Sequence, residues 1–251
     1  MAAAVAAIDH AKLYSDLLYR FEYVSSFVGL GESDIKAIKD SAPLIAPLVP
    51  VIVDAVYTKL FSFDITRNIF LKPGEGFHGK VASTANELSL DDPQIKFRKD
   101  FLAKYLVKLV TAEYDAKFVA YLDRVGRIHS ATPGKESRIN VEYIHINALF
   151  GWLHGFLAET IDTLPQLQDK PAVRAKTLAA FSKLLWIQND FFAMYYMRDS
   201  ELFQPSINRT AAAPGSGAGL LGAIGLSGEK GLMTLASVIA VSAICAWRFG
   251  T

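Results

Sequence analysis

Proline spacing is the feature that most constrains the fold of this 251-residue chain. Three long stretches contain no proline: 94–132, 134–164 and 172–204. Because proline breaks helices and favours turns, proline-free stretches of this length are typical of long helices rather than short strands. The alternating apolar pattern of strands and the Asn-Gly turns of β-hairpins do not occur in the sequence. The chain is therefore predicted to be all-α.

Apolar residues recur in these stretches every three or four positions, as on the buried face of a helix. They are Phe97, Phe101, Leu102, Tyr105, Leu106 and Leu109 in the first stretch, Val141, Ile144, Ala148, Trp152 and Phe156 in the second, and Leu178, Phe181, Leu185, Phe192 and Tyr195 in the third, where the polar Gln188 falls on the same stripe. Asp91-Asp92-Pro93 predicts a helix start, because a carboxylate caps the N-terminus and proline fits the first turn. Further helices are expected near 8–28, 33–41 and 44–61. Together they predict one helical domain over residues 8–200.

The C-terminal part differs in composition from this domain. Residues 205–230 are rich in Gly, Ser and Ala, which is typical of a linker. Residues 231–247 carry no charge, and Trp247 is followed by Arg248. At about 1.5 Å per residue this run spans roughly 25 Å, the lower limit for crossing a bilayer. We expect 231–248 to be a tail-anchor transmembrane helix that holds the domain at a membrane on its cytosolic side. The alternative is an apolar helix that docks on the domain or on a second copy.

Composition narrows the possible partners and ligands. The net charge of +1 argues against a nucleic-acid-binding surface. The single cysteine, Cys245, excludes an internal disulfide and a cysteine-rich zinc site. Glu142 and His145 match the Glu-x-x-His of di-iron bundles, but no second such motif occurs on another helix. His10 and His78 are expected to be exposed.

His129 is the histidine whose setting best suits a ligand. It ends an apolar stripe of Phe118, Leu122 and Val125, and the helix is predicted to stop directly after it, at 130–134. A proximal haem ligand has this setting, a neutral imidazole emerging from an apolar wall near a helix end. A histidine buried in an ordinary core has the same spacing, so both interpretations remain open on pattern alone.

Tyr57 is the candidate on the opposite side of such a ligand. It lies between Val53 and Leu60 on an apolar helix face. A buried phenol needs a hydrogen-bond partner, and a bound diatomic gas could supply one. A backbone carbonyl is the equally open alternative.

Four local segments resemble the protoglobin and globin-coupled-sensor family. They are Val53-Asp54-Ala55-Val56-Tyr57 with Leu60, Asn68-Ile69-Phe70, Arg98-Lys99-Asp100-Phe101, and Arg124-Val125-Gly126-Arg127-Ile128-His129. The last is the most specific, since it resembles the family's R-[IV]-G-x-x-H segment, which ends in the proximal histidine. The resemblance covers about residues 8–198 and implies a globin fold with an extra N-terminal helix.

The resemblance also implies a site. It implies a b-type haem whose iron is bound by His129, with a distal hydrogen bond from Tyr57. The residues implied to line the haem are Phe70, Phe97, Phe101, Val125, Leu149 and Leu153. Phe97 stands where classical globins have their distal histidine, and Val56 stands where some members have an aromatic residue. The ligand implied is O2, CO or NO, and a homodimer is implied through the helices near 137–163 and 172–198.

Three functions remain open at this point. The first is a membrane-tethered gas sensor or gas-binding protein. The second is a haem enzyme, such as an NO dioxygenase or a peroxidase-like protein, although the sequence shows no reductase domain to supply electrons. The third is a haem-free helical membrane adaptor. The resemblance favours the first.

Overall fold

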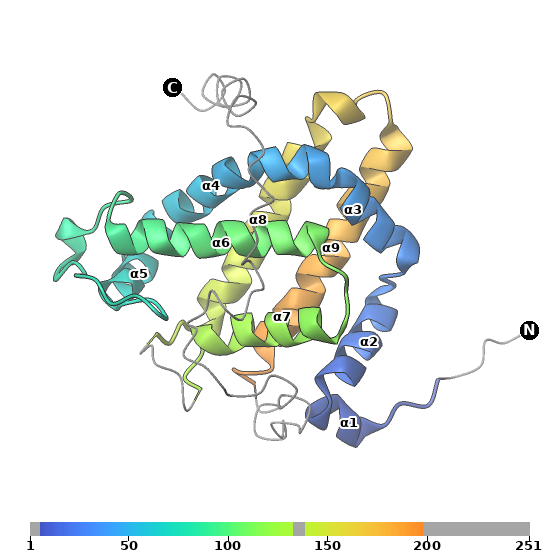
Figure 1. Cartoon of the computed structure of the whole chain (residues 1–251), viewed down its shortest axis with the longest axis horizontal. Helices are drawn as coiled ribbons and strands as arrows, with labels where there is room; N and C mark the ends of the chain where they lie inside the picture. The colour runs from blue at the N-terminus through green and yellow to red at the C-terminus, as the bar shows by residue number, and fades with distance from the viewer. Residues whose placement is uncertain (1–5, 133–138, 198–251) are drawn as a thin grey trace, which may run out of the picture. The chain divides into compact units, whose positions relative to one another are not determined.

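The computed structural model describes residues 6–132 and 139–197, which form helices joined by turns (Figure 1). The helices group into two compact units. Unit 1 comprises the described parts of Met1–Ile38, Ala112–Gly134 and Asn140–Ala213, and unit 2 is formed mainly by Lys39–Thr111. The predicted linker 205–230 and tail anchor 231–248 lie outside the described residues.

Unit 1 is built around two long helices that pack against each other, α8 (Tyr143–Asp162) and α9 (Pro171–Ala193). The helices α7 (Ala116–His129) and α2 (Leu17–Val28) both pack on α9 and on each other. The short α1 (His10–Ser15) contacts α2, and a 3-10 turn, η4 (Pro165–Leu167), joins α8 to α9. The core of the unit includes Phe118, Leu122, Ile161, Leu184, Ile187 and Phe191, all almost fully buried.

One helix expected near 8–28 is two helices in the structure. Asp16 adopts an extended conformation between α1 and α2, and its carboxylate accepts hydrogen bonds from the backbone amides of Leu18 and Tyr19. Aspartate in that conformation starts a helix rather than continuing one, so the prediction of an unbroken helix was wrong. Gly29 then ends α2 with φ 71°, a left-handed conformation that glycine adopts without steric cost.

Unit 2 contains the later part of α3 (Glu32–Ile45), then η1 (Ala46–Leu48), α4 (Val49–Phe61), α5 (Asp64–Arg67), η2 (Asn68–Leu71), η3 (Ala85–Glu87) and α6 (Pro93–Thr111). Within it α4 packs against α6 and α5. The expected boundaries at 41 and 44 were wrong, because α3 continues through Pro43 to Ile45 and α4 begins only at Val49. The prolines at 47 and 50 instead occupy the first turns of η1 and α4, where a missing amide costs nothing.

Other predicted boundaries are confirmed. The helix α6 begins at Pro93, and α7 ends at His129. Asp115 starts α7 by accepting a hydrogen bond from the backbone amide of Phe118 at 2.9 Å. The proline-free stretch 94–132 therefore holds two helices, separated by 112–115.

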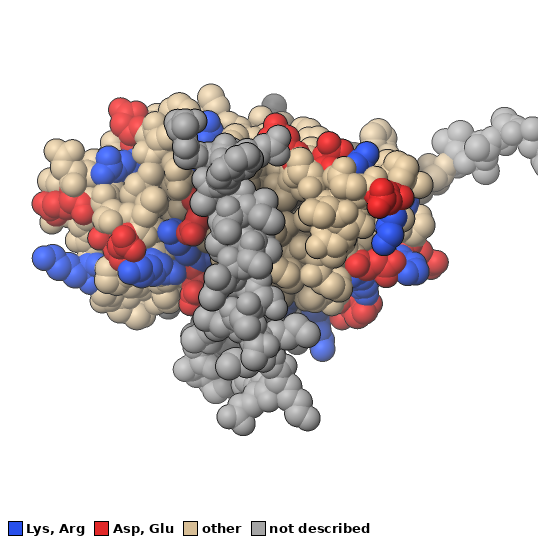
Figure 2. Space-filling model, turned by 90° about the horizontal axis from the view of Figure 1, so that it is seen from above, with Lys and Arg blue, Asp and Glu red and all other residues tan. Residues whose placement is uncertain are grey.

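One helical run in the described chain, Glu32–Phe61, is long and apolar enough to cross a membrane by length and composition. A buried core helix passes the same test, and Ile38, Ile52 and Val53 in this run are buried. On the face shown in Figure 2, acidic and basic side chains lie beside one another among uncharged residues.

Candidate haem-binding residues

The proximal candidate, His129, lies at the last position of α7 in unit 1. Its Nδ1 lies 2.7 Å from the carbonyl oxygen of Val125, one turn earlier. Because a carbonyl only accepts, Nδ1 carries the proton and donates it, and the lone pair of the neutral ring is on Nε2. In most metal-binding histidines, the ring nitrogen that does not bind the metal donates a hydrogen bond, and this bond orients the imidazole. The tautomer therefore suits metal ligation through Nε2.

The end of α9 holds His129 from two directions. The ring of Phe192 lies against the imidazole, with centroids 5.3 Å apart and planes inclined by 59°. The hydroxyl of Tyr196, in the turn that follows α9, donates to the carbonyl oxygen of His129 at 3.0 Å. The backbone amide of Val141 donates to that same carbonyl at 2.8 Å. The backbone and the ring of His129 are thus fixed separately.

Gly126 lies at a point of α7 where there is no room for a side chain. A Cβ at this position would lie 2.2 Å from the carbonyl oxygen of Phe191. That is far inside van der Waals contact, and the obstacle is backbone rather than a flexible side chain. The glycine therefore lets α7 and α9 approach closely three residues before His129. The hydroxyl of Tyr195, just after α9, also donates a hydrogen bond to the carboxylate of Asp123 on α7.

The distal candidate, Tyr57, lies on α4 in unit 2 and is only 6% exposed. The centroid of its ring lies 5.7 Å from that of Phe70, and the ring centroids of Phe70 and Phe61 lie 5.3 Å apart. No hydrogen-bond partner for the Tyr57 hydroxyl is found within the part of the chain that the structure describes. Burial raises the pKa of Tyr57 well above its usual range, and the nearby charge of Arg98 offsets only part of this. The phenol therefore stays protonated and retains its donor.

Arg98 is a residue of this group that the sequence did not single out as a site residue. Its guanidinium lies over the ring of Phe70 at 5.0 Å and donates to the carbonyl oxygen of Lys72 at 2.6 Å. Gln94 donates to the carbonyl of Phe70 itself. Phe70 is thereby held by α6 from its ring and from its backbone. The hydrogen-bonding partners are far apart in sequence, so no local pattern indicates them.

The remaining predicted lining residues fall into the same two units. In unit 2, Phe97 and Phe101 are half-buried on α6 and contact each other edge-to-face at 4.7 Å. In unit 1, Leu153 is buried and Leu149 half-buried, both on α8. Phe192 contacts both His129 and Phe150. The sequence indicates it only as one member of an apolar stripe.

The other histidines show no such setting. His10, His78 and His154 are exposed, and His145 is half-buried on α8. Among residues 6–132 and 139–197, no group of three or more His, Cys, Asp or Glu residues is placed to hold a metal ion. An imidazole acting with a prosthetic group needs no such cluster.

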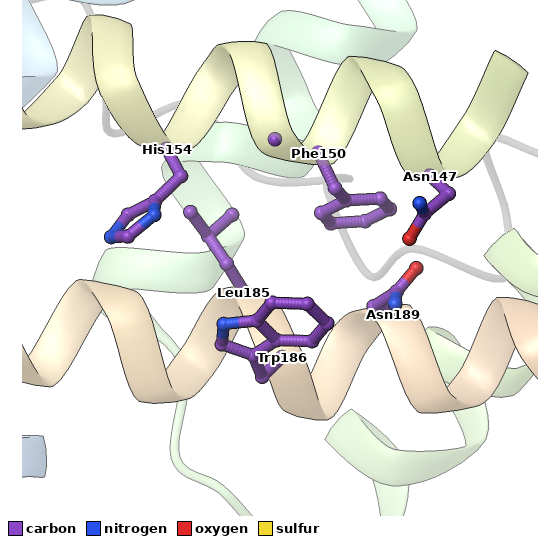
Figure 3. Close-up of a pocket in the computed structure, with 7 residues that line it drawn as sticks. Asn147, Phe150, His154, Leu185, Trp186 and Asn189 are labelled. Carbon is purple, nitrogen blue, oxygen red and sulfur yellow. The ribbon is translucent and has the colours of Figure 1, made fainter.

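A shallow pocket of about 110 Å³ opens between α8 and α9. It is lined by Asn147, Phe150, Gly151, His154, Leu185, Trp186 and Asn189. Figure 3 shows the Trp186 ring reaching from α9 toward α8, between His154 and Asn189. This pocket is much smaller than the usual site for a drug-sized ligand and does not include the proximal or distal candidates.

Comparison with known protein families gives a match over most of the chain. The family model described as Protoglobin matches residues 17–202, which include both candidates. The chain belongs to the protoglobin family. Protoglobin family membership implies haem binding and suggests a diatomic gas ligand. The resemblance noted in the sequence is thereby confirmed.

Solved structures show that this protoglobin has the all-α globin fold. One match is the globin domain of the Geobacter sulfurreducens globin-coupled sensor, with a TM-score of 0.54 and 17% sequence identity. The alignment covers 70% of this protoglobin and 97% of that domain. No curated protein matches the sequence.

Proposed function

We propose that this protoglobin binds a b-type haem through Nε2 of His129 and uses it to bind O2, CO or NO reversibly, as a sensor or gas-binding protein. The observation that carries the proposal is the tautomer of His129. Its Nδ1 donates to the Val125 carbonyl, so the ring presents the Nε2 lone pair that a metal requires. Haem iron supplies the position at which a diatomic gas binds.

The chain's own residues fit a haem protein on a second count. The Tyr57 side chain is 6% exposed, and no hydrogen bond of its hydroxyl is found within the described residues. A gas ligand that accepts a hydrogen bond would supply a partner. The role proposed for Tyr57 is to present its proton to that ligand, while Phe70, Phe97 and Phe101 provide apolar surface and exclude water. Val125, Leu149 and Leu153 have the same apolar role in unit 1.

Haem titration of the full chain tests this function. We expect one equivalent of haem to bind and to give a Soret band. His129→Ala is expected to lose most haem retention, whereas the exposed His154→Ala serves as the matched control and should bind as the wild type does. Wild-type haem content and an unchanged Soret band in purified His129→Ala would refute the assignment. An enzymatic role as an NO dioxygenase or peroxidase is the second candidate, and turnover with NO and a reductant distinguishes it.

A homodimer through α8 and α9 is the assembly that we propose. Trp186 on α9 is 58% exposed, and Ile144 and Val173 on these helices are also largely exposed. A Cβ added at Gly151 or Gly155 meets no atom within 4 Å, so packing against the described residues does not account for this glycine pair. An open apolar surface with small residues suits close approach by a second copy.

Sedimentation of residues 1–204 tests the dimer. The wild type is expected to sediment as a dimer and Trp186→Glu as a monomer, because burying a carboxylate in an apolar interface is costly. The control is Phe27→Glu on α2, where the aromatic side chain is 80% exposed but lies outside α8 and α9. A monomeric wild type, or a dimer unaffected by Trp186→Glu, would exclude this interface.

We also propose that residues 231–248 tether the globin domain to a membrane, with the domain in the cytosol. The support is the uncharged run 231–247 and its flanking Lys230 and Arg248. Membrane fractionation of the full chain against residues 1–204 tests the tether. Equal recovery of both proteins in the soluble fraction would exclude it.

A further inference from the structure

In unit 1, the end of α9 and the turn that follows it make a set of contacts with the second half of α7. Three residues take part: Phe192 contacts the imidazole of His129, Tyr195 bonds to Asp123, and Tyr196 bonds to the carbonyl of His129. Nothing in haem binding itself requires the carbonyl of the ligating residue to be held by a tyrosine.

We propose that Tyr196 is a positioning residue for the axial ligand: its hydroxyl fixes the backbone of His129 so that the end of α9 sets the position of the imidazole. This inference rests on the proposed function, because it assigns Tyr196 a role toward the haem ligand. It concerns Tyr196 alone and not the residues that touch haem or gas.

The position of His129 makes this hold necessary. As the last residue of α7, His129 has a carbonyl that no later turn of the same helix can engage. That carbonyl receives instead the Tyr196 hydroxyl at 3.0 Å and the Val141 amide at 2.8 Å. Without the phenol, only one of these two bonds would hold the backbone at which the side chain begins. A helix end held by fewer bonds frays more easily.

The surroundings of the Tyr196 phenol favour its hydrogen bond to the His129 carbonyl. Burial raises the pKa of Tyr196 well above its usual range, so the hydroxyl remains a donor at all physiological pH values. The ring is braced by Tyr143 of α8, with centroids 5.5 Å apart. The backbone amide of Tyr196 bonds to the carbonyl of Ala193 at 2.9 Å, which joins the tyrosine directly to the end of α9.

The close contact at Gly126 makes the coupling rigid. Since the backbone of α7 at Gly126 lies directly against the backbone of α9 at Phe191, the two helices have little room to slide past each other. The Nδ1 bond to Val125 and the contact with Phe192 limit rotation of the imidazole. Tyr196, together with the Val141 amide, limits translation of the His129 backbone.

Resonance Raman spectroscopy of the ferrous, ligand-free holoprotein tests the proposal through the iron–histidine stretching mode. Tyr196→Phe keeps the ring and removes only the hydrogen bond, so we expect a shifted or broadened mode. We also expect haem transfer to an apoglobin acceptor to be about two- to tenfold faster, the change that one ordinary hydrogen bond corresponds to. Circular dichroism of the same samples verifies that the variant is folded.

Tyr195→Phe is the matched control. It removes one phenol hydrogen bond from the same turn to the same helix, but at Asp123 instead of His129. Its iron–histidine mode should equal that of the wild type. The proposal is overturned if Tyr196→Phe leaves both the mode and the haem-loss rate unchanged, or if Tyr195→Phe alters the mode equally. A wild type that binds no haem, or shows no iron–histidine mode, contradicts the proposed function instead.

Discussion

Asp34 on α3 makes the most quantitative prediction about the stability of unit 1. Its carboxylate is almost fully buried and lies 2.7 Å from Nζ of Lys176 and 3.0 Å from Nζ of Lys183, both on α9. The backbone amide of Gly31 donates to it at 3.0 Å. Although desolvation by burial acts to raise the pKa of Asp34, these hydrogen bonds and charges outweigh it and lower the pKa from 3.8 to about 2.

The lowered pKa of Asp34 corresponds to a contribution of about 2.5 kcal/mol to the free energy of unfolding at neutral pH, since a tenfold change in an equilibrium constant is about 1.4 kcal/mol. A carboxyl whose pKa is lower in the folded state stabilises the fold above its unfolded pKa and loses that effect as the pH falls toward its folded pKa. The contribution should therefore fall to roughly half near pH 3 and nearly vanish near pH 2. We expect Asp34→Asn to lower the free energy of unfolding by about 2–3 kcal/mol at neutral pH.

Urea denaturation, monitored by circular dichroism at neutral pH and near pH 3, measures this effect. Asp54→Asn is the matched control, because Asp54 also pairs with a lysine, Lys99, at 2.9 Å, but its side chain is 68% exposed. An exposed pair contributes about 0–1 kcal/mol, so this variant should remain close to the wild type. Equal effects of the two substitutions, or an effect of Asp34→Asn that is the same at both pH values, would refute the reasoning.

Two further predictions concern the candidate site. Gly126→Ala places a methyl group 2.2 Å from the Phe191 carbonyl oxygen. We expect it to lower the free energy of unfolding by about 1–3 kcal/mol or more, and the melting temperature by about 2–4 °C for each kcal/mol. An unchanged calorimetric melting temperature would exclude the close contact. Tyr57→Phe should speed O2 release several-fold to about tenfold in stopped-flow measurements, because one hydrogen bond to the ligand is lost. Tyr143→Phe, whose hydroxyl bonds to Asn189, is the control, and an O2 release rate in Tyr57→Phe equal to that of the wild type contradicts the distal role.

Features governed by local physics were predictable from the sequence. The start of α6 at Pro93 and the end of α7 at His129 both follow from capping residues and from the apolar stripe. The motif around His129 also led to the family, but it gave no reason for its glycine. The structure supplies that reason in the approach of the Phe191 carbonyl, which comes from a helix more than 60 positions later.

Features that depend on distant partners were not predictable. The break at Asp16 depends on whether an aspartate turns its carboxylate to cap a new helix, and the sequence pattern allows both outcomes. Tyr196 and Arg98 gained no significance from spacing, because their partners, the carbonyls of His129 and Lys72, are backbone atoms far away in the sequence. Any residue type offers a backbone carbonyl, so no residue pattern marks such a bond.

Ligand rescue tests the central claim, that His129 binds the haem iron, most directly. His129→Gly removes the imidazole at the last position of α7. We expect the full-length variant to retain little haem, and added free imidazole to restore both haem retention and the wild-type Soret spectrum. A His129→Gly protein that keeps the wild-type spectrum and haem content without imidazole would contradict the claim.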